Sequence, residues 1–209
     1  SDKYILSPEI LSESLEFLYS PILLKGKVHL FYSPPGVGKS SLIYKVIQNL
    51  LRSQRVNRVL CIFSDLDVTN AEFQELVSEF HNPDDVSKSR FIPVFPQKGY
   101  FEDLVKSIQD GSLKEQRIDL ILIDSLEQFF VLSGKSFFKG IGVFMGILRW
   151  LGIFQGVTTV LIHHTNKEGD FAGHSSTFRQ ADVFYRIRRA GRFKWFGDAL
   201  KHRGAKLLN

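Results

Sequence analysis

Residues 30–41 read Leu30-Phe31-Tyr32-Ser33-Pro34-Pro35-Gly36-Val37-Gly38-Lys39-Ser40-Ser41, and this stretch decides the fold. An apolar run ends in a turn rich in proline and glycine, and a helical pattern begins directly after it. That order is typical of a P-loop, whose turn points several backbone N–H groups inward. The helix that follows adds the positive end of its dipole, which favours an anion at the same place. The stretch therefore predicts a phosphate-binding loop.

Two side chains of this loop carry chemistry. Lys39 is expected to reach the β- and γ-phosphates of a nucleotide, and the Ser40 hydroxyl is expected to bind Mg²⁺. One position departs from the consensus GxxxxGK[ST], because Ser33 stands where the first glycine belongs. The predicted nucleotide contacts of the loop are Ser33, Pro34, Pro35, Gly36, Val37, Gly38, Lys39, Ser40 and Ser41.

Length and composition limit the class of protein. A chain of 209 residues, 44% hydrophobic and 23% charged, fits one soluble domain with a large core. No signal-peptide pattern opens it, and its single cysteine, Cys61, lies in an apolar run. We therefore expect no disulfide framework and a cytoplasmic location. Residues 137–155 are apolar, but Lys139 and Arg149 interrupt them, so no membrane span is predicted.

The positive charge is concentrated towards the C-terminus. Residues 165–209 hold 10 Lys or Arg and 4 Asp or Glu, a net charge of +6, whereas residues 1–164 hold 17 and 18, a net charge of −1. A basic region of this kind would suit a surface that binds nucleic acid. A solvated hairpin face explains the same charge without a partner. The sequence leaves both interpretations open.

Apolar periodicity predicts helices that alternate with strands. The first helix is expected over 7–24, with Pro8 at its first position. Further helices are predicted at 39–52, 69–80, 100–109 and 137–155, with strands at 27–32, 58–64, 91–94, 119–124 and 157–163. Alternating runs at 183–189 and 193–202 indicate two antiparallel strands.

This alternation predicts an α/β fold class. A mostly parallel, doubly wound twisted sheet would carry helices on both faces, with a C-terminal antiparallel hairpin at one edge. We expect one domain over residues 1–209, in which 1–24 form a helical lead-in and 182–209 form a basic hairpin edge.

Asp124 ends an apolar strand, as the acid of a nucleotide hydrolase does. A carboxylate at the carboxyl end of such a strand can hold the water shell of Mg²⁺ beside Ser40. The alternative is a helix N-cap, since Ser125-Leu126-Glu127 follows. We favour the metal role.

The letters Ser133-Gly134-Lys135-Ser136 repeat part of the P-loop pattern. Phe129 stands where the first glycine would belong, and the group follows Asp124 by only ten residues. No second phosphate-binding loop is therefore predicted.

A second carboxylate, Asp65, follows the strand predicted at 58–64. A carboxylate at that edge can polarise the attacking water as a general base. Asp67 competes for this role, and Glu127 is a third candidate in a less direct position. A turn or an N-cap role is the alternative for either Asp, but Thr69 already offers a cap for the next helix. Asp65 is the preferred candidate.

The run His163-His164-Thr165-Asn166-Lys167 ends the strand predicted at 157–163. Paired histidines could suggest zinc, but adjacent residues of a strand point to opposite faces. No spaced third ligand completes a recognisable metal pattern. We expect His164 to read the γ-phosphate as a polar sensor, and capping of the strand end is the alternative.

These motifs, in this order, resemble those of RecA-like ATPases. The resemblance rests on the loop at 33–41, the acid after 58–64, Ile121–Ser125 and the run His163–Lys167. The most similar branch is that of RepA-type hexameric replicative helicases. There a Gly- or Ser-rich stretch follows, and then an Asp that opens the next strand. The counterparts in this chain are Gly173-His174-Ser175-Ser176 and Asp182.

The resemblance implies a cofactor set and roles for named residues. ATP and Mg²⁺ would be the cofactors, with Mg²⁺ supported by Ser40 and Asp124 and the γ-phosphate sensed by His164. The family places a Glu where this chain has Asp65, whose side chain is one methylene shorter. Slow hydrolysis is one reading of that difference, and another is that Asp65 does not fill this role.

The resemblance also implies assembly. Lys201-His202-Arg203 resembles the Lys-x-Arg element that RecA-like helicases insert into a neighbour's site, where Arg203 would neutralise charge on the transferred phosphoryl group. Hydrolysis would then depend on a homo-oligomer, a ring or a filament. Arg179 and Arg186 are rivals for this role, and an exposed basic strand end is the alternative.

Residues 168–180 fall where the family places a loop that meets single-stranded nucleic acid. Phe171, Phe178 and Arg179 could supply stacking and phosphate contacts there. The sequence thus predicts a Mg²⁺-dependent ATPase that acts on nucleic acid, as a helicase or a replication or recombination ATPase. Two rivals stay open: a catalytically weak relative that serves as a nucleotide-dependent assembly or loading module, and a small-molecule kinase.

Overall fold

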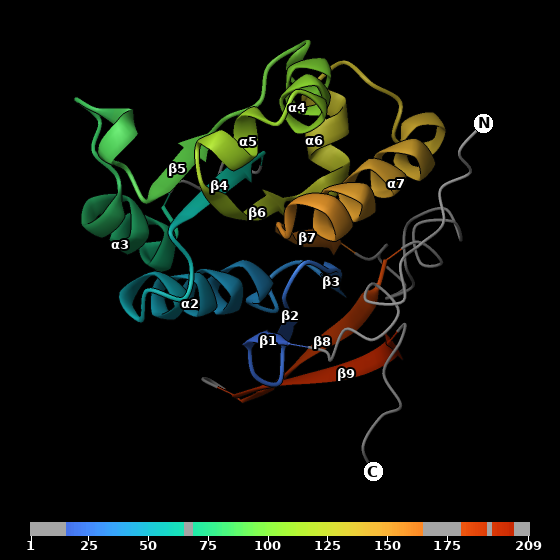
Figure 1. Ribbon diagram of the computed structural model, residues 1–209. Helices are drawn as coiled ribbons and strands as arrows, with labels where there is room; N and C mark the ends of the chain where they lie inside the picture. The colour runs from blue at the N-terminus through green and yellow to red at the C-terminus, as the bar shows by residue number, and fades with distance from the viewer. Residues whose placement is uncertain (1–15, 65–68, 165–180, 192–193, 203–209) are drawn as a thin grey trace.

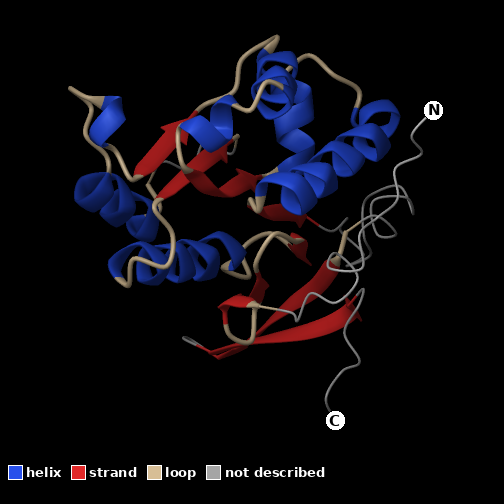
Figure 2. Cartoon of the chain, in the orientation of Figure 1, coloured by secondary structure: helices blue, strands red, loops and turns tan. Residues whose placement is uncertain are grey.

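The structure is a computed structural model, and it describes residues 16–64, 69–164, 181–191 and 194–202. A seven-stranded sheet forms its centre (Figures 1 and 2). Its strands run in the order β5-β4-β6-β7-β3-β8-β9. Their bounds are β3 Val28–Ser33, β4 Arg58–Phe63, β5 Phe91–Val94, β6 Ile118–Asp124, β7 Thr158–His164, β8 Val183–Gly191 and β9 Lys194–His202. The first six strands of this order are parallel, and β9 pairs antiparallel with β8. The predicted fold class is confirmed.

The strand order decides which loops meet. β7 lies between β3, which leads into the P-loop, and β6, which ends at Asp124. β4 lies on the other side of β6. Because these strands are parallel, their carboxyl ends share one edge of the sheet, where α/β proteins bind their ligands. The segments singled out in the sequence therefore start from neighbouring positions.

Helices cover both faces of the sheet (Figure 1). On one face lie α2, Lys39–Arg52, and α3, Ala71–Phe80. The other face carries α4, Tyr100–Gln109, α6, Leu126–Leu132, and α7, Phe137–Gln155. Two short elements complete the described helices: α5, Ser112–Glu115, and a 3-10 helix at Val86–Lys88. The sequence did not predict α5 or α6, because short helices carry too few turns for a clear period.

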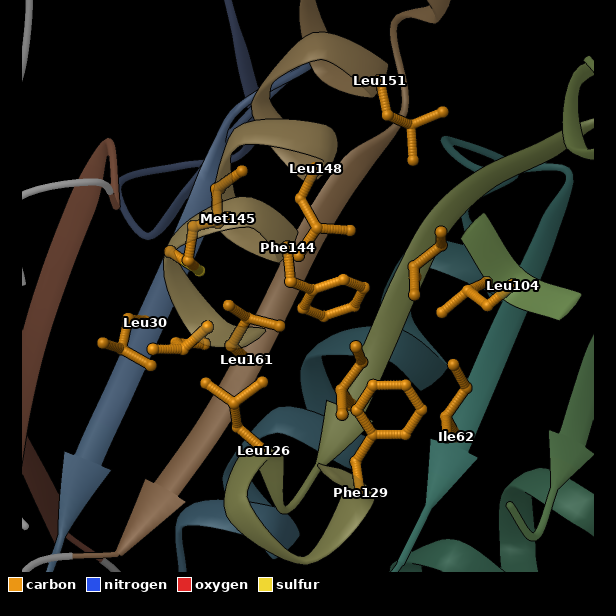
Figure 3. Packing of buried hydrophobic residues seen from close by; sticks show 14 of the residues in the cluster. Leu30, Ile62, Leu104, Leu126, Phe129, Phe144, Met145, Leu148, Leu151 and Leu161 are labelled. Atoms are coloured by element: carbon orange, nitrogen blue, oxygen red, sulfur yellow. The ribbon is translucent and has the colours of Figure 1, made fainter. Parts of the chain in front are cut away.

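Two hydrophobic cores separate at the sheet because successive strand residues face opposite ways. In β3, Leu30 and Tyr32 join the core under α7, whereas Phe31 joins the core under α2. Figure 3 shows Phe144, Met145 and Leu148 of α7 packed over β3 and β7. Both faces of these strands are buried, which explains their nearly continuous apolar runs.

The helix α7 belongs to the folded core. By length and composition it is apolar enough to cross a bilayer, with a mean hydropathy of 1.5 over its most apolar window. Its buried side packs on the sheet, and Gly152 allows its last turn to touch the backbone of Gly26. A Cβ at Gly152 would overlap the Gly26 carbonyl, so this contact requires glycine. Such packing is that of a core helix.

The helix predicted over 7–24 is wrong from residue 16 onward, and residues 7–15 with Pro8 lie outside the described part. The chain forms a two-stranded antiparallel hairpin, β1 Phe17–Tyr19 and β2 Leu23–Leu24. Pro21 would stand inside the predicted helix, where it lacks an N–H and its ring clashes with the preceding turn. The apolar residues that suggested a helix, Leu18 and Leu23 among them, are buried from the strands instead.

Candidate functional site

The P-loop turn is built on two glycines in the left-handed region. Gly36 has φ 76° and Gly38 has φ 91°. A residue with a Cβ would be strained in either conformation. Gly38 is the N-cap of α2, and Lys39 is the first residue of that helix. The first turn of α2 therefore points its free backbone N–H groups towards this loop.

Lys39 is folded back onto the loop and onto the neighbouring strand. Its side chain is buried, with 3% of the residue exposed. The ammonium Nζ donates to the Ser33 carbonyl at 3.0 Å, to Ser33 Oγ at 2.9 Å and to the Pro34 carbonyl at 3.3 Å. It also contacts His164 Nδ1 at 3.2 Å. Two residues predicted for the site, 125 positions apart, thus lie within hydrogen-bonding distance of each other.

The contact between Lys39 and His164 fixes the imidazole tautomer. An ammonium group has only donors, so Nδ1 must accept and the ring proton lies on Nε2. Strand register produces this contact, since Ser33 and His164 are partners on the adjacent strands β3 and β7.

The two adjacent histidines do point to opposite faces. His163 is buried and stacks on the Phe137 ring with 5.5 Å between centroids, whereas His164 is partly exposed at the loop. Within the described residues, no group of three His, Cys, Asp or Glu could hold a metal ion.

Asp124 lies at the same edge of the sheet and is 3% exposed. Tyr44 Oη donates to Asp124 Oδ2 at 3.0 Å, which links the end of β6 to α2. The N-cap of α6 is Ser125, so the alternative N-cap role for Asp124 is wrong. Burial raises the pKa of the Cys61 thiol well above its ordinary value, and the Asp124 carboxylate adds to that rise.

Tyr44 relates Asp124 to the predicted metal ligand. Ser40 and Tyr44 are four residues apart on α2, so they lie on one side of the helix, one turn apart. The residue that binds the Asp124 carboxylate therefore lies on the same side of α2 as Ser40. Carboxylate and hydroxyl oxygens are the hard ligands that Mg²⁺ prefers, so the donor set fits that ion.

A family model described as "AAA domain" matches residues 11–170, which is more than half of the chain. The chain belongs to this AAA domain family. With its parallel sheet and P-loop it is a RecA-like P-loop ATPase. It is also 26% identical over 117 residues to the DNA repair and recombination protein RadB of Methanosphaera stadtmanae. The match covers 55% of this chain and 48% of RadB, so the chain spans about half the length of that curated relative.

The start of α3 contacts the P-loop helix of this AAA domain. The predicted cap, Thr69, is wrong, since Asn70 is the N-cap and its Oδ1 accepts from the Phe73 N–H at 3.0 Å. Its Nδ2 donates to Ser41 Oγ at 3.0 Å. The sequence did not predict the roles of Asn70 and Tyr44. The cap lies one residue beyond the predicted Thr69, and no sequence pattern marks a tyrosine that binds a distant carboxylate.

Glu127 is exposed in the first turn of α6. It lines a pocket of about 310 Å³ together with Ser64, Ser125 and His164. The third candidate for water activation therefore lies beside the sensor candidate. Its position in the sequence, three residues past the strand, did not indicate that it would lie near His164.

Several predicted site residues of the AAA domain lie outside the described part. They are Asp65, Asp67, Lys167, Phe171, Phe178, Arg179 and Arg203. Lys201 lies on β9 and pairs with Phe184 of β8, and Arg186 is exposed on β8. The described residues thus bring together the P-loop, Asp124 and His164.

Two other motifs have structural explanations. Ser133–Ser136 join α6 to α7, so a helix rather than a strand precedes them and they form no P-loop. Asp182 precedes β8, as the resemblance implied, and its Oδ2 accepts from the Val28 N–H at 3.0 Å. Its Oδ1 accepts from Arg149 Nε of α7 at 3.2 Å. Asp182 therefore ties β3 and α7 together.

Proposed function

We propose that this AAA domain binds ATP with Mg²⁺ and hydrolyses it as the motor core of a homo-oligomer that acts on nucleic acid. The observation that carries the proposal is the meeting of Lys39, His164 and Asp124 at one edge of the sheet, next to a P-loop. The printed name of the relative RadB, a DNA repair and recombination protein, supports a role on DNA. The run His163–Lys167 favours the RepA-type helicase branch as the specific form.

In this proposal each residue has a distinct role. Water attacks the γ-phosphorus, its proton passes to a carboxylate, and the bond to the β–γ bridging oxygen breaks. Lys39 exchanges its contacts with Ser33 and Pro34 for phosphate oxygens. His164, as the polar sensor, contacts the γ-phosphate. Ser40 and Asp124 hold Mg²⁺, which neutralises charge on the phosphates. Asp65 orients the water, with Asp67 and Glu127 as the competing carboxylates.

Assembly supplies the remaining charge in this proposal. Arg203, with Lys201 beside it, would reach the phosphates of a neighbouring copy, so hydrolysis would need a ring or a filament. Single-stranded nucleic acid would contact residues 168–180 and the basic C-terminal region. We place the protein in the cytoplasm, as one ATPase domain over residues 1–209.

A matched set of variants tests this function. Steady-state ATPase, with and without single-stranded DNA, is measured for the parent chain and for Lys39→Ala, Asp65→Ala and Arg203→Ala. We expect DNA to stimulate turnover and each substitution to remove most of it. Glu127→Ala is added to compare the competing carboxylate. If Asp65→Ala and Glu127→Ala both turn ATP over at the rate of the parent, the assignment of a catalytic carboxylate is contradicted. DNA affinity that does not weaken with salt would argue against phosphate contacts.

A second function is favoured by one contact. Ser33 stands where the consensus has glycine, and its hydroxyl accepts from Lys39 at 2.9 Å. That bond competes with phosphate for the ammonium, so the domain could bind ATP and turn it over slowly, as an assembly or loading module. Ser33→Gly tests this. Faster turnover in the variant would support the module, whereas unchanged turnover would favour the motor.

A further inference from the structure

The helices α2 and α3 lie side by side (Figure 1), and a row of polar side-chain contacts joins them. We call it the α2–α3 seam. Ser41, Lys45, Gln48 and Arg52 contribute from α2, and Asn70, Glu72, Glu75 and Glu79 contribute from the start of α3 onward. The α2 members follow each other at three or four residues, as one side of a helix does. The two helices therefore lie side by side with their N-termini at the same edge of the sheet.

The seam begins at the P-loop. Ser41 Oγ accepts from Asn70 Nδ2 at 3.0 Å. Asn70 also caps α3, because its Oδ1 accepts from the Phe73 N–H at 3.0 Å. One turn further along α2, Lys45 pairs with Glu72 at 3.4 Å. The amide of Asn70 thus joins the N-terminus of α3 to the first turn of α2.

Electrostatics agree with a charged Glu72 at this point. Burial pushes its pKa up, but its own backbone N–H, the nearby Ser41 and Lys45 hold the pKa below its ordinary value. The carboxylate is therefore ionised at neutral pH and pairs with Lys45.

Ser41 directly follows Ser40 in the first turn of α2. The contact from Asn70 therefore ties the turn that carries Ser40 to α3. One turn later, Tyr44 ties the same helix to Asp124 of β6. Two separate contacts, one to α3 and one to β6, thus set where the start of α2 lies relative to the sheet.

We propose that Asn70 is a positioning residue for the metal-dependent part of nucleotide binding. It acts through Ser41, and it keeps the first turn of α2 where a Mg²⁺–nucleotide complex needs the Ser40 hydroxyl. The proposal rests on the proposed Mg²⁺ role of Ser40. It predicts a defect that depends on the metal, which a general weakening of the fold would not produce.

Nucleotide affinity measured with Mg²⁺ and with EDTA tests this proposal. A fluorescent ATP analogue is titrated into the parent chain, Asn70→Ser and Ser41→Ala. Serine keeps the N-cap but is too short to reach Ser41. We expect Asn70→Ser to lower the affinity about fivefold with Mg²⁺, the worth of one hydrogen bond of about 1 kcal/mol. The affinity in EDTA should stay within twofold of the parent.

Ser41→Ala removes the same contact from the P-loop side and suits a helix. Ser41 is itself a predicted nucleotide contact, so this variant should lose affinity with Mg²⁺ and with EDTA alike. In the Ser41→Ala background, Asn70→Ser should lower the Mg²⁺ affinity little further, because both changes break one contact. Equal losses with Mg²⁺ and with EDTA in the single variant Asn70→Ser, or additive losses in the double variant, would overturn the proposal.

Two controls separate this proposal from its foundation. Arg52→Ala breaks the far end of the seam, where Arg52 Nη2 lies 2.6 Å from Glu79 Oε2, and should leave both affinities unchanged. Ser40→Ala tests the metal role itself. If Ser40→Ala shows no Mg²⁺-dependent loss, the proposed function fails at that ligand. If Ser40→Ala shows the loss and Asn70→Ser does not, only the positioning role is wrong.

Discussion

The helices α2 and α7 cover opposite faces of one sheet, yet the side chains that they expose to solvent differ in polarity. The exposed side of α2 carries polar residues such as Lys45, Asn49 and Arg52, and the seam joins that helix to α3. The exposed side of α7 carries large apolar residues: Phe138 at 65%, Val143 at 67%, Trp150 at 42%, Ile153 at 52% and Phe154 at 57%.

The difference indicates that the two helices have different roles in the domain. α2 starts at the P-loop, so its polar contacts can orient the chemistry at that end. α7 follows a turn after α6 and supplies packing, with Phe137, Gly152 and Arg149 in contact with other parts of the domain. An exposed apolar stripe of this kind is uncommon on a monomer that has no partner. Substitutions can test each half of this contrast.

The largest effect is expected at the last turn of α7. Gly152→Ala would place a Cβ against the Gly26 carbonyl, which is a backbone group and cannot rotate away as a flexible side chain could. We expect a loss of more than about 3 kcal/mol in the free energy of unfolding. Urea denaturation measures it.

Gly146→Ala is the matched control in the same helix. A Cβ there meets no atom within 4 Å, so the variant should gain about 0.5–1 kcal/mol from helix propensity. Equal effects at both glycines would mean that α7 does not depend on its contact with Gly26.

The next effect concerns the polar tie of α7. The Asp182 side chain is 11% exposed, and it joins Arg149 to the backbone of Val28. Arg149→Ala leaves that carboxylate without its cation and should cost about 1–3 kcal/mol in denaturation experiments. Arg52→Ala, which breaks the exposed pair of the seam, should cost less. The reverse order would contradict the view that the seam serves orientation more than stability.

Much of the fold was readable from the sequence because its strongest signals are local. The buried strands are nearly continuous apolar runs, whereas α2 and α7 repeat a helical period over many residues. All of them lie within a residue or two of their predicted bounds. The hairpin at β1 and β2 was missed because a few apolar residues near Pro21 fit a helix as well as two short strands. Pro21 inside that stretch was the available warning.

The site was predictable as far as strand ends determine it. Ser33, Asp124 and His164 each end a strand, so a parallel sheet brings them together. The contacts between helices were not predictable, since nothing in the sequence places Asn70 opposite Ser41. Spatial adjacency across 29 positions depends on how α2 and α3 pack.

A smaller effect is expected from pH at the seam. The pKa of Glu72 lies below its ordinary value in the folded chain. Its contribution to stability is therefore complete above the ordinary pKa and is lost as pH falls through the folded value. Glu72→Gln should cost less than about 1 kcal/mol at pH 7. The difference from the parent, measured by urea denaturation from pH 7 to pH 3, should shrink below about pH 5. A difference that stays constant to pH 3 would mean that the charge contributes nothing.

The smallest change in stability is expected on the exposed side of α7. Ile153→Ser and Phe138→Ser replace side chains that are 52% and 65% exposed, so each should change the free energy of unfolding by no more than about 0.5 kcal/mol. Leu148→Ser, on the buried side of the same helix, is the matched control and should cost several times more, because Leu148 is fully buried. A large loss at Ile153 would show that this side is covered within the folded chain. A small loss would mean that these exposed apolar side chains do not stabilise the folded domain, so the fold by itself does not require them.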